Sequence, residues 1–413
     1  MIQDRNIVCV ACSWFDHPTS KHHVMRHLSA RNHVLWVNYH ASRCPQLTRC
    51  DARLALRRLR QAWAGTQRVA PQMDVLSPLL VPMPEVRWTR ALNAYALRRQ
   101  ISTALRRLPP RPTQLWLFAP DIPELIGRVP AERVVYYCVD DFAAFTGYNT
   151  ALIEELERRT IAASDVVITT SAKLYEERRT RHPNVHLVPH GVDFEHFAAV
   201  PGLTQDAVPD ELKRIRRPIF AFMGLTSDYL DLELLAQAAR ARQNWSFVLL
   251  GDVHCRLDAI AGLKNVHVLG GRPYAQLPAY CRGFDVGLIP FRMNRLTEAV
   301  NPIKLFEYLA AGLPVVSAPL PAVRHYAPAV QIAQTLPEFL AACERAVAMA
   351  GDGNPRARQD LVRRESWRCQ VEWLSHIVGG GPAVEDAERT CQPGASEELH
   401  LDPSRYGAPA RVC

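Results

Sequence analysis

Lys304 and Glu307 are the charged pair whose types and spacing best fit a chemical task in this chain. They lie in the segment NPIKLFEYLAAGLPVVS (301–317), which predicts a short helix followed by a buried strand. Asn301 suits the N-cap of that helix, and Gly312 supplies the left-handed residue that ends it.

The N–H groups at such a helix start attract anions, and Lys304 adds a full positive charge in the first turn. Glu307 lies one turn deeper on the same face, where its carboxylate can accept hydrogen bonds from hydroxyl groups. This combination suits a nucleotide, with its diphosphate on Lys304 and its ribose on Glu307. The alternative is an ordinary i,i+3 salt bridge on a solvated helix.

The rest of the chain alternates predicted strands with predicted helices, which is typical of parallel α/β sheets. A charged segment at 201–218 separates two such halves, and this predicts a cleft with ligands at the carboxyl ends of the strands. No G-x-G-x-x-G follows the first strand, which disfavours a dinucleotide oxidoreductase. The predicted strands are 6–12, 33–38, 114–119, 133–139, 165–170, 186–190, 219–224, 246–251, 266–270, 286–290 and 314–318, and the predicted helices include 20–30, 150–164 and 366–378.

The helix segment resembles the nucleotide-sugar motif of GT-B fold glycosyltransferases, P-x-K-x-x-E-Y-x-A-x-G-x-P-V-V. The resemblance extends over residues 5–378 and is nearest to teichuronic-acid-type transferases and, more distantly, to the xanthan glucuronosyltransferase. The matching motif residues are Pro302, Lys304, Glu307, Tyr308, Ala310, Gly312, Pro314, Val315 and Val316. Further similar landmarks, in the expected order, are SDVVITTSAKLYEE (164–177), VPHGVDFEHF (188–197), SFVLLGD (246–252) and YCRGFDVGLIPF (280–291).

The resemblance implies an α/β protein of GT-B fold, with two Rossmann-like parallel-sheet domains that face a central cleft. Residues 1–200 would bind the acceptor and residues 201–365 the nucleotide-sugar. Residues 366–378 would form a helix that crosses back to the first domain. The Pro- and Gly-rich tail at 379–413 is expected to be disordered.

The resemblance also places donor-site residues in the loops of the second half, among them Asn301 directly before the phosphate-binding helix. Gly224 ends its first strand, where a missing side chain lets the backbone approach a phosphate, although a plain turn glycine is the alternative. Arg272 and Tyr274 lie in a loop that lines the nucleobase in the resembling family. Arg292 and Arg295 precede the phosphate-binding helix and are candidates to clamp the diphosphate, although exposed arginines are usually only solvated.

Two features depart from the wider family. Many retaining relatives carry an Arg/Lys pair after the first strand of the second half, whereas this chain has GLTSDYLDLELL (224–235) there. The first of two glutamates in those relatives corresponds to Ala299 here. We therefore expect Lys304 and the nearby arginines to neutralise the phosphates, and the resemblance does not decide between retention and inversion.

An inverting transferase needs a group that deprotonates the acceptor hydroxyl. Asp140 and Asp141 follow the predicted strand 133–139, and repulsion between adjacent carboxylates can raise a pKa into a useful range. Helix capping or a surface turn is their alternative role. In resembling enzymes the loop after the first strand meets the acceptor, so His17 and Asp16 are the rival bases.

The composition is that of a soluble globular protein, with 413 residues, 48% hydrophobic and 22% charged. The N-terminus enters a predicted strand without a secretion signal. Eleven scattered cysteines favour reduced thiols over a disulfide framework. These features predict a cytoplasmic protein.

Arginines dominate the charge between Arg49 and Arg111, where the chain has thirteen of them and no lysine. Part of this stretch predicts a basic amphipathic helix, which can lie on the anionic inner face of the plasma membrane. An ordinary solvated helix is the alternative. No recognised RNA- or DNA-binding motif accompanies the arginines, so nucleic acid is not an expected partner. The arginines Arg98, Arg99, Arg106 and Arg107 sit beside an apolar line at Leu97, Ile101, Leu105 and Leu108.

Together these features predict a hexosyltransferase-type glycosyltransferase that moves a sugar from a nucleoside-diphosphate-sugar to a glycan or lipid-linked acceptor for a surface polysaccharide. No cofactor beyond that co-substrate is expected. No metal is expected either, because His23 and His27 are spaced i,i+4 without an evident third ligand and are interpreted as helix-surface residues. The alternatives are a nucleotide-sugar epimerase of the same fold and a non-catalytic nucleotide-sugar-binding or assembly protein.

Overall fold

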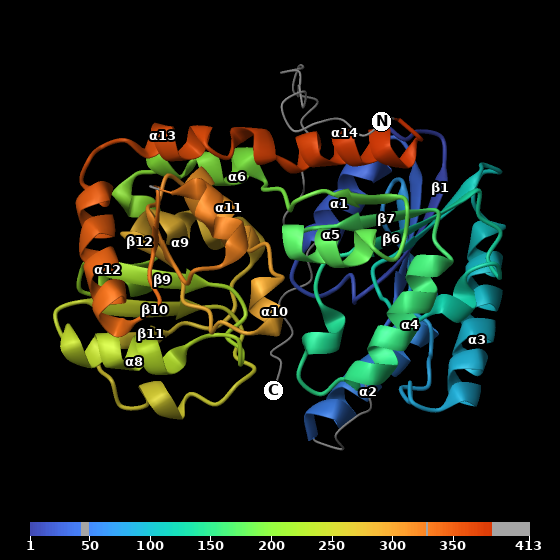
Figure 1. Cartoon of the computed structure of the whole chain (residues 1–413), viewed down its shortest axis with the longest axis horizontal. Coiled ribbons are helices and arrows are strands. Elements are labelled where there is room, and N and C mark those ends of the chain that lie inside the picture. The colour runs from blue at the N-terminus through green and yellow to red at the C-terminus, as the bar shows by residue number, and fades with distance from the viewer. Residues whose placement is uncertain (43–48, 328, 382–413) are drawn as a thin grey trace. The chain divides into compact units, whose positions relative to one another are not determined.

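The chain divides into two compact units in this computed structural model, which describes residues 1–42, 49–327 and 329–381. Unit 1 comprises Met1–Pro189 and the described residues from Gln370 on, and unit 2 comprises His190–Cys369. In each unit, helices pack around one sheet (Figure 1). Most of the predicted tail at 379–413 lies outside the described residues, and the predicted cleft between domains stays a prediction.

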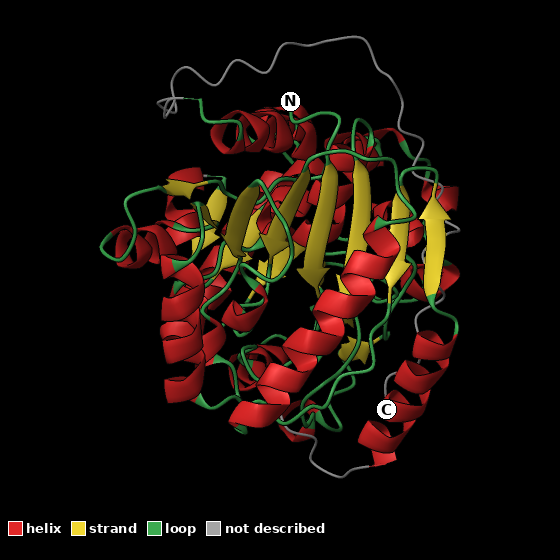
Figure 2. Cartoon of the chain, turned by 90° about the vertical axis from the view of Figure 1, so that its right-hand side faces the viewer, coloured by secondary structure: helices red, strands yellow, loops and turns green. Residues whose placement is uncertain are grey.

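Unit 1 is built on a sheet with the strand order β3-β4-β2-β1-β5-β6-β7-β8. Its neighbouring strands pair in parallel, except for the antiparallel pair β3 and β4. Figure 2 shows these strands side by side with helices on both faces. The strands are β1 (Asn6–Ala11), β2 (His33–Asn38), β3 (Thr66–Ala70), β4 (Met73–Leu76), β5 (Thr113–Leu117), β6 (Arg133–Cys138), β7 (Val166–Thr169) and β8 (Val185–Leu187). The helices are α1 (Ser20–Ser29), α2 (Arg49–Trp63), α3 (Arg87–Leu105), α4 (Thr150–Ala162) and α5 (Ala172–Arg179), and α14 (Trp367–Val378) ends the described chain.

Unit 2 is built on a fully parallel sheet with the strand order β11-β10-β9-β12-β13-β14. Its strands are β9 (Ile219–Met223), β10 (Ser246–Leu250), β11 (Val266–Val268), β12 (Val286–Ile289), β13 (Val315–Ser317) and β14 (Val330–Ile332). Its helices are α6 (Phe194–Ala198), α7 (Asp210–Lys213), α8 (Leu232–Ala241), α9 (Leu277–Gly283), α10 (Arg295–Glu298), α11 (Ile303–Ala310), α12 (Leu336–Ala350) and α13 (Pro355–Asp360).

The central strand β9 shows why the apolar runs of the sequence become buried strands. Successive side chains of a strand point to opposite faces of the sheet. Ala221 and Met223 therefore enter the core under α9 and α11, whereas Phe220 and Phe222 enter the core under α8 and α12. A strand covered on both faces must be apolar throughout, as IFAFM is.

The seat of α11 on the sheet depends on Tyr308, whose side chain is fully buried. Its hydroxyl oxygen accepts a hydrogen bond from the Met223 N–H at 2.6 Å and donates one to the Ala221 carbonyl at 3.2 Å. Its ring lies on Gly287 of β12, where a Cβ would come within 2.5 Å of Tyr308 Cγ. The helix is therefore fixed on the backbones of two neighbouring strands.

The ends of α11 differ slightly from the prediction. Pro302 is the N-cap, because its ψ of 111° is extended, so the helix starts after Pro302 and Asn301 lies before the cap. Gly312 has the expected positive φ of 76°. The N–H groups of Gly312 and Leu313 bond to the carbonyls of Leu309 and Tyr308, which is the Schellman arrangement.

The predicted α/β class is confirmed, and every predicted strand is present with ends shifted by at most three residues. The strands that the sequence did not predict are β3, β4 and β14. The segment of β3, TQRVA, lacks a fully apolar face, and β14 has only three residues, so neither gives a clear pattern.

The predicted apolar line of α3 is directed inward. Leu97 and Ile101 are fully buried in unit 1, so this line packs on the protein's own core and does not face a membrane. The arginines beside it, Arg98, Arg99, Arg106 and Arg107, are exposed. Among the described residues, none of the helices combines the length and the apolar character needed to cross a bilayer.

Candidate functional site

The predicted donor residues of unit 2 follow neighbouring parallel strands. Gly224 comes after β9, Arg272 follows β11, and Arg292 follows β12. Because parallel strands end at the same edge of a sheet, the three loops lie at one edge of unit 2. This is the edge at which open α/β sheets bind their ligands.

Gly224 and Lys304 lie side by side at this edge. A Cβ built on Gly224 would lie 3.5 Å from Lys304 Cε. A Cβ on Gly251, which follows β10, would lie 1.8 Å from the Gly224 carbonyl oxygen, so only glycine allows these backbones to touch. Gly251 is a site residue that the sequence did not single out, although SFVLLG shows the same strand-then-glycine signal as IFAFMG.

Lys304 and Glu307 form the salt bridge that their spacing allows, with 2.6 Å between Nζ and Oε2. The helix around them is not solvated, since most of α11 is buried and the Glu307 side chain is only 5% exposed. A carboxylate has about four lone-pair positions, so this pairing leaves Glu307 capacity for ribose hydroxyls. The nucleotide roles of Lys304, Glu307 and Asn301 stay predictions.

Arg272 anchors its own loop. Its guanidinium donates to both carboxylate oxygens of Glu211, to the Tyr280 hydroxyl, and to the carbonyls of Leu269 and Gly271. An arginine has five N–H donors, and these five bonds use them all. The Arg272 side chain therefore has no N–H group left for the nucleobase of a donor. A contact between the nucleobase and the backbone of this loop stays a prediction.

Tyr274 is also engaged within unit 2. The residue is buried, and its ring stacks on the His196 ring with centroids 4.8 Å apart and planes 12° apart. Arg292 is exposed and lies 3.9 Å from Asp231, and Arg295 is the exposed first residue of α10. The roles of these three residues toward a diphosphate or a base stay predictions.

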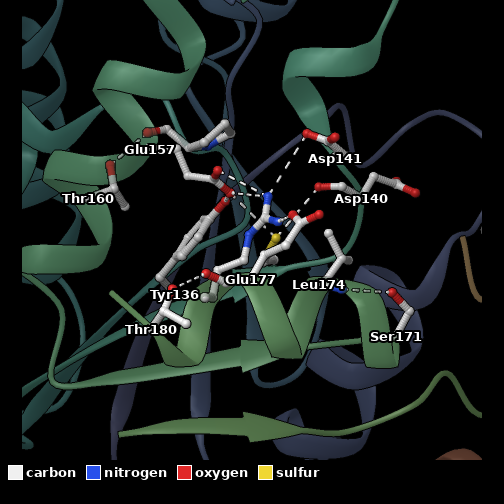
Figure 3. A network of polar contacts seen from close by, with 12 residues as sticks. Tyr136, Asp140, Asp141, Glu157, Thr160, Ser171, Leu174, Glu177 and Thr180 are labelled. Carbon is white, nitrogen blue, oxygen red and sulfur yellow. Dashed lines mark hydrogen bonds and ion pairs between the residues drawn. The ribbon is translucent and has the colours of Figure 1, made fainter. Parts of the chain in front are cut away.

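In unit 1, Asp141 belongs to a buried ionic network around Arg178. Figure 3 shows Asp141 and Glu157 joined by dashed lines to one central guanidinium, that of Arg178. The Glu157 oxygens lie 3.1 and 3.2 Å from Arg178 Nη2, and Asp141 Oδ1 lies 3.9 Å from it. Tyr136 also donates to Glu157 at 2.7 Å. Asp141 thus helps to neutralise a cation that is only 2% exposed.

The adjacent Asp140 has a different environment. Its carboxylate points away from the Arg178 network (Figure 3). Burial raises the pKa of Asp140 to about 6, the ammonium group of Lys21 opposes this rise, and the charge of Asp141 adds to it. A carboxylate with a pKa near 6 is ionised at neutral pH and is a stronger base than an ordinary one. The two adjacent aspartates therefore differ in their environments.

The rival bases lie in the loop after β1. Asp16 lines a cavity of about 260 Å³ in unit 1, and its carboxylate lies 3.4 Å from the guanidinium of Arg57. His17 is exposed and is not among the described residues that line this cavity. The loop therefore directs Asp16, rather than His17, toward the space that a ligand can enter.

The histidines that were interpreted as helix-surface residues need one correction. His23 is only 4% exposed, because it lies on the inner face of α1, whereas His27 is partly exposed. Within the described part of the chain, no group of three or more His, Cys, Asp or Glu residues could hold a metal ion.

Comparisons with known proteins show similarity to glycosyltransferases. Residues 217–350 match the family model described as glycosyl transferases group 1. The chain is 27% identical over 310 residues to the putative teichuronic acid biosynthesis glycosyltransferase TuaH of Bacillus subtilis (strain 168), covering 68% of this chain and 77% of that protein.

Solved structures show the same fold. Sucrose-phosphate synthase from Thermosynechococcus elongatus superposes with a TM-score of 0.64 at 14% identity, covering 91% of this chain and 98% of that one. Anabaena HepE in complex with UDP and glucose superposes with a TM-score of 0.60 at 12% identity, covering 92% of this chain and 100% of that one. The chain therefore has the GT-B fold.

The contrast between the two aspartates yields a stability prediction. Asp141→Asn should lower the free energy of unfolding by about 1–3 kcal/mol, because it removes a negative charge beside buried Arg178 while Glu157 remains. Asp140→Asn should leave stability within about 0.5 kcal/mol of wild type. Thermal and urea unfolding of both variants measure this difference. Equal losses in the two variants would contradict the separate roles.

Proposed function

We propose that this GT-B fold glycosyltransferase, whose residues 217–350 form a group 1 glycosyl transferase domain, moves a hexosyl group from a nucleoside-diphosphate-sugar to a glycan or lipid-linked acceptor. The observation that most supports it is Lys304, held at the start of α11 beside Gly224 inside the matched region. The similarity to a teichuronic acid biosynthesis enzyme supports a role in surface polysaccharide assembly.

The chemistry of the transfer assigns each end of the reaction to one unit. Asp140 takes the proton of the acceptor hydroxyl, and the acceptor oxygen forms a bond to the anomeric carbon of the donor sugar. The bond between that carbon and the diphosphate breaks, and the electron pair leaves with the diphosphate. Lys304 and the N–H groups at the start of α11 stabilise the charge of this leaving group, so we propose a transfer without a metal ion.

Two alternative functions predict different products from a nucleotide-sugar. A nucleotide-sugar epimerase isomerises its sugar without any acceptor, and a binding protein leaves the sugar unchanged under all conditions. Incubation of the purified chain with nucleotide-sugars alone, and then with acceptor mixtures, separates them. We expect transfer only when an acceptor is present. Isomerised donor would support the epimerase, and binding without turnover would support the binding protein.

The donor site can be tested by nucleotide affinity. Lys304→Ala should weaken the binding of UDP more than that of uridine, by about 1.5–3 kcal/mol, because only UDP offers phosphates to the ammonium group. Glu307→Ala should weaken both ligands alike, since both carry the ribose. Calorimetric titration of each variant measures these losses.

A matched control for this test is Lys264→Ala, which removes an exposed lysine elsewhere in unit 2. It should change neither affinity. The placement of the diphosphate would be refuted if Lys304→Ala weakened UDP and uridine equally.

The proposed base can be tested by turnover and pH. Asp140→Asn should keep UDP affinity and reduce turnover by roughly 10²–10⁴-fold, because only the proton transfer is lost. In wild type, kcat/KM should fall as the pH drops below about 6, since protonated Asp140 cannot accept the hydroxyl proton. The product anomer should be inverted relative to the donor.

Other outcomes would reassign the base. A retained anomer, or near-normal turnover in Asp140→Asn, would transfer the role to Asp16 or to another mechanism. The turnover of the Asp141→Asn variant must be divided by its folded fraction before it is compared with wild type, because Asp141 supports the Arg178 network.

Peripheral attachment to the inner face of the membrane is part of the proposal, but through a different face of α3 than the sequence suggested. Trp88, Leu92 and Tyr95 are exposed at i, i+4 and i+7 and form one apolar stripe on the helix. The exposed arginines Arg98 and Arg99 continue from it. Aromatic rings beside basic residues fit the headgroup region of an anionic bilayer.

Vesicle binding tests this attachment. Arg98→Glu combined with Arg99→Glu should release the chain from vesicles rich in anionic lipid, and Trp88→Ser should weaken binding at all salt concentrations. The matched control is the pair Arg214→Glu and Arg216→Glu, two exposed arginines of unit 2. If wild type ignores such vesicles at low salt, the arginines of α3 serve another purpose.

A further inference from the structure

The cavity of unit 1 carries an excess of positive charge. It is lined by Lys21, Arg57 and Arg58, and Asp16 is the one acidic side chain among the described residues that line it. The cations come from two separate helices, α1 and α2, and converge on a space of about 260 Å³. Like charges gather in this way where they bind an anion, because their mutual repulsion otherwise destabilises the fold.

Lys21 and Arg57 make one ion pair with an acidic side chain within the described residues, that of Arg57 with Asp16. The Lys21 ammonium group lies 3.9 Å from the Cys12 thiol and 6.0 Å from the centre of the Phe142 ring. Arg57 lies 3.4 Å from Asp16 and also approaches the Phe15 carbonyl. The Asp16 side chain is 53% exposed, so this ion pair is accessible to water and contributes little to stability.

The effect of the charge is visible at His40, which lines the same cavity. Burial, together with the charge of Arg58, lowers the pKa of His40 to about 4. His40 is therefore neutral at physiological pH and can offer a hydrogen bond without adding charge.

Aromatic rings form the other wall of the cavity. Phe118, Phe142 and Tyr148 line it together with the polar groups. Such a wall packs against the apolar face of a sugar ring, and the few polar groups fix its orientation. Phe142 follows the proposed base Asp140 by two residues, and the charge of Lys21 acts on the pKa of Asp140. The cavity thus lies next to the group that would activate an acceptor hydroxyl.

We propose that the acceptor carries an anionic group, a carboxylate or a phosphate, and that Lys21, Arg57 and Arg58 bind this group in the cavity of unit 1. The inference rests on the proposed function, since it describes the second substrate of that reaction. The anion fixes the acceptor so that its hydroxyl reaches Asp140. A uronic acid residue and a sugar phosphate share this chemistry.

Calorimetric titration of the full chain tests the inference with three small probes: methyl glucuronide, glucose 1-phosphate and the neutral methyl glucoside. At least one anionic probe should bind about tenfold or more tightly than methyl glucoside, and its affinity should fall with salt. Tighter binding of the glucuronide points to a uronic acid in the acceptor glycan. Tighter binding of the phosphate points to a phosphate-linked acceptor. Equal affinity for all three probes overturns the proposal.

Variants of α2 provide the matched comparison. Arg57→Gln combined with Arg58→Gln should abolish the preference for the anionic probes, whereas Arg57→Lys with Arg58→Lys should retain it. Arg60→Gln changes an exposed arginine of the same helix that is not among the residues lining the cavity, and it should have no effect. An equal loss in the Arg60→Gln variant overturns the assignment.

UDP binding, measured on the same samples, keeps the two proposals distinguishable. It should be unchanged in every α2 variant, because the donor residues belong to unit 2. If wild type binds UDP but prefers no anionic probe, the inference fails and the proposed donor site stands. If wild type binds the anionic probes but no nucleotide, the proposed function fails instead.

Discussion

The hydroxyl of Tyr308 on the backbone of β9 is the interaction on which the candidate donor site depends. Both partner groups, the Met223 N–H and the Ala221 carbonyl, are buried, so the helix cannot shift without leaving polar groups unpaired. The ring on Gly287 fixes the same helix from the side. Because these contacts fix the position of α11 on the sheet, the first turn of the helix places Lys304 at the end of β9, beside Gly224.

A second constraint acts in unit 1, where buried Arg178 pairs with the carboxylates of Glu157, Asp141 and Glu177. Removing a guanidinium from water is costly, and Glu157 and Asp141 offset this cost. The carboxylate of the neighbouring Asp140 points away from this network (Figure 3). Two adjacent, chemically identical residues therefore lie in different environments, one beside a buried cation and one outside its network.

The arginine-rich stretch of the sequence serves two surfaces at once. On α3 the arginines are exposed, and the apolar line beside them faces the core, so the helix presents a different stripe of Trp88, Leu92 and Tyr95 outward. On α2, Arg57 and Arg58 line the cavity of unit 1. The number of arginines along the sequence does not show which of them are exposed and which line a cavity. That depends on which face of each helix packs against the sheet.

The sequence by itself determined the α/β class, every strand except β3, β4 and β14, and the motif at α11, because apolar runs and turn residues act locally. The same local signals set the end of α11 at Gly312. Tertiary structure alone decided that Arg272 is saturated by Glu211 and its neighbours, and that the Asp141 carboxylate lies beside Arg178. It also decided that Gly251 touches Gly224. These contacts join residues far apart in the chain, and burial and hydrogen-bond partners become defined only once the strands and helices have packed.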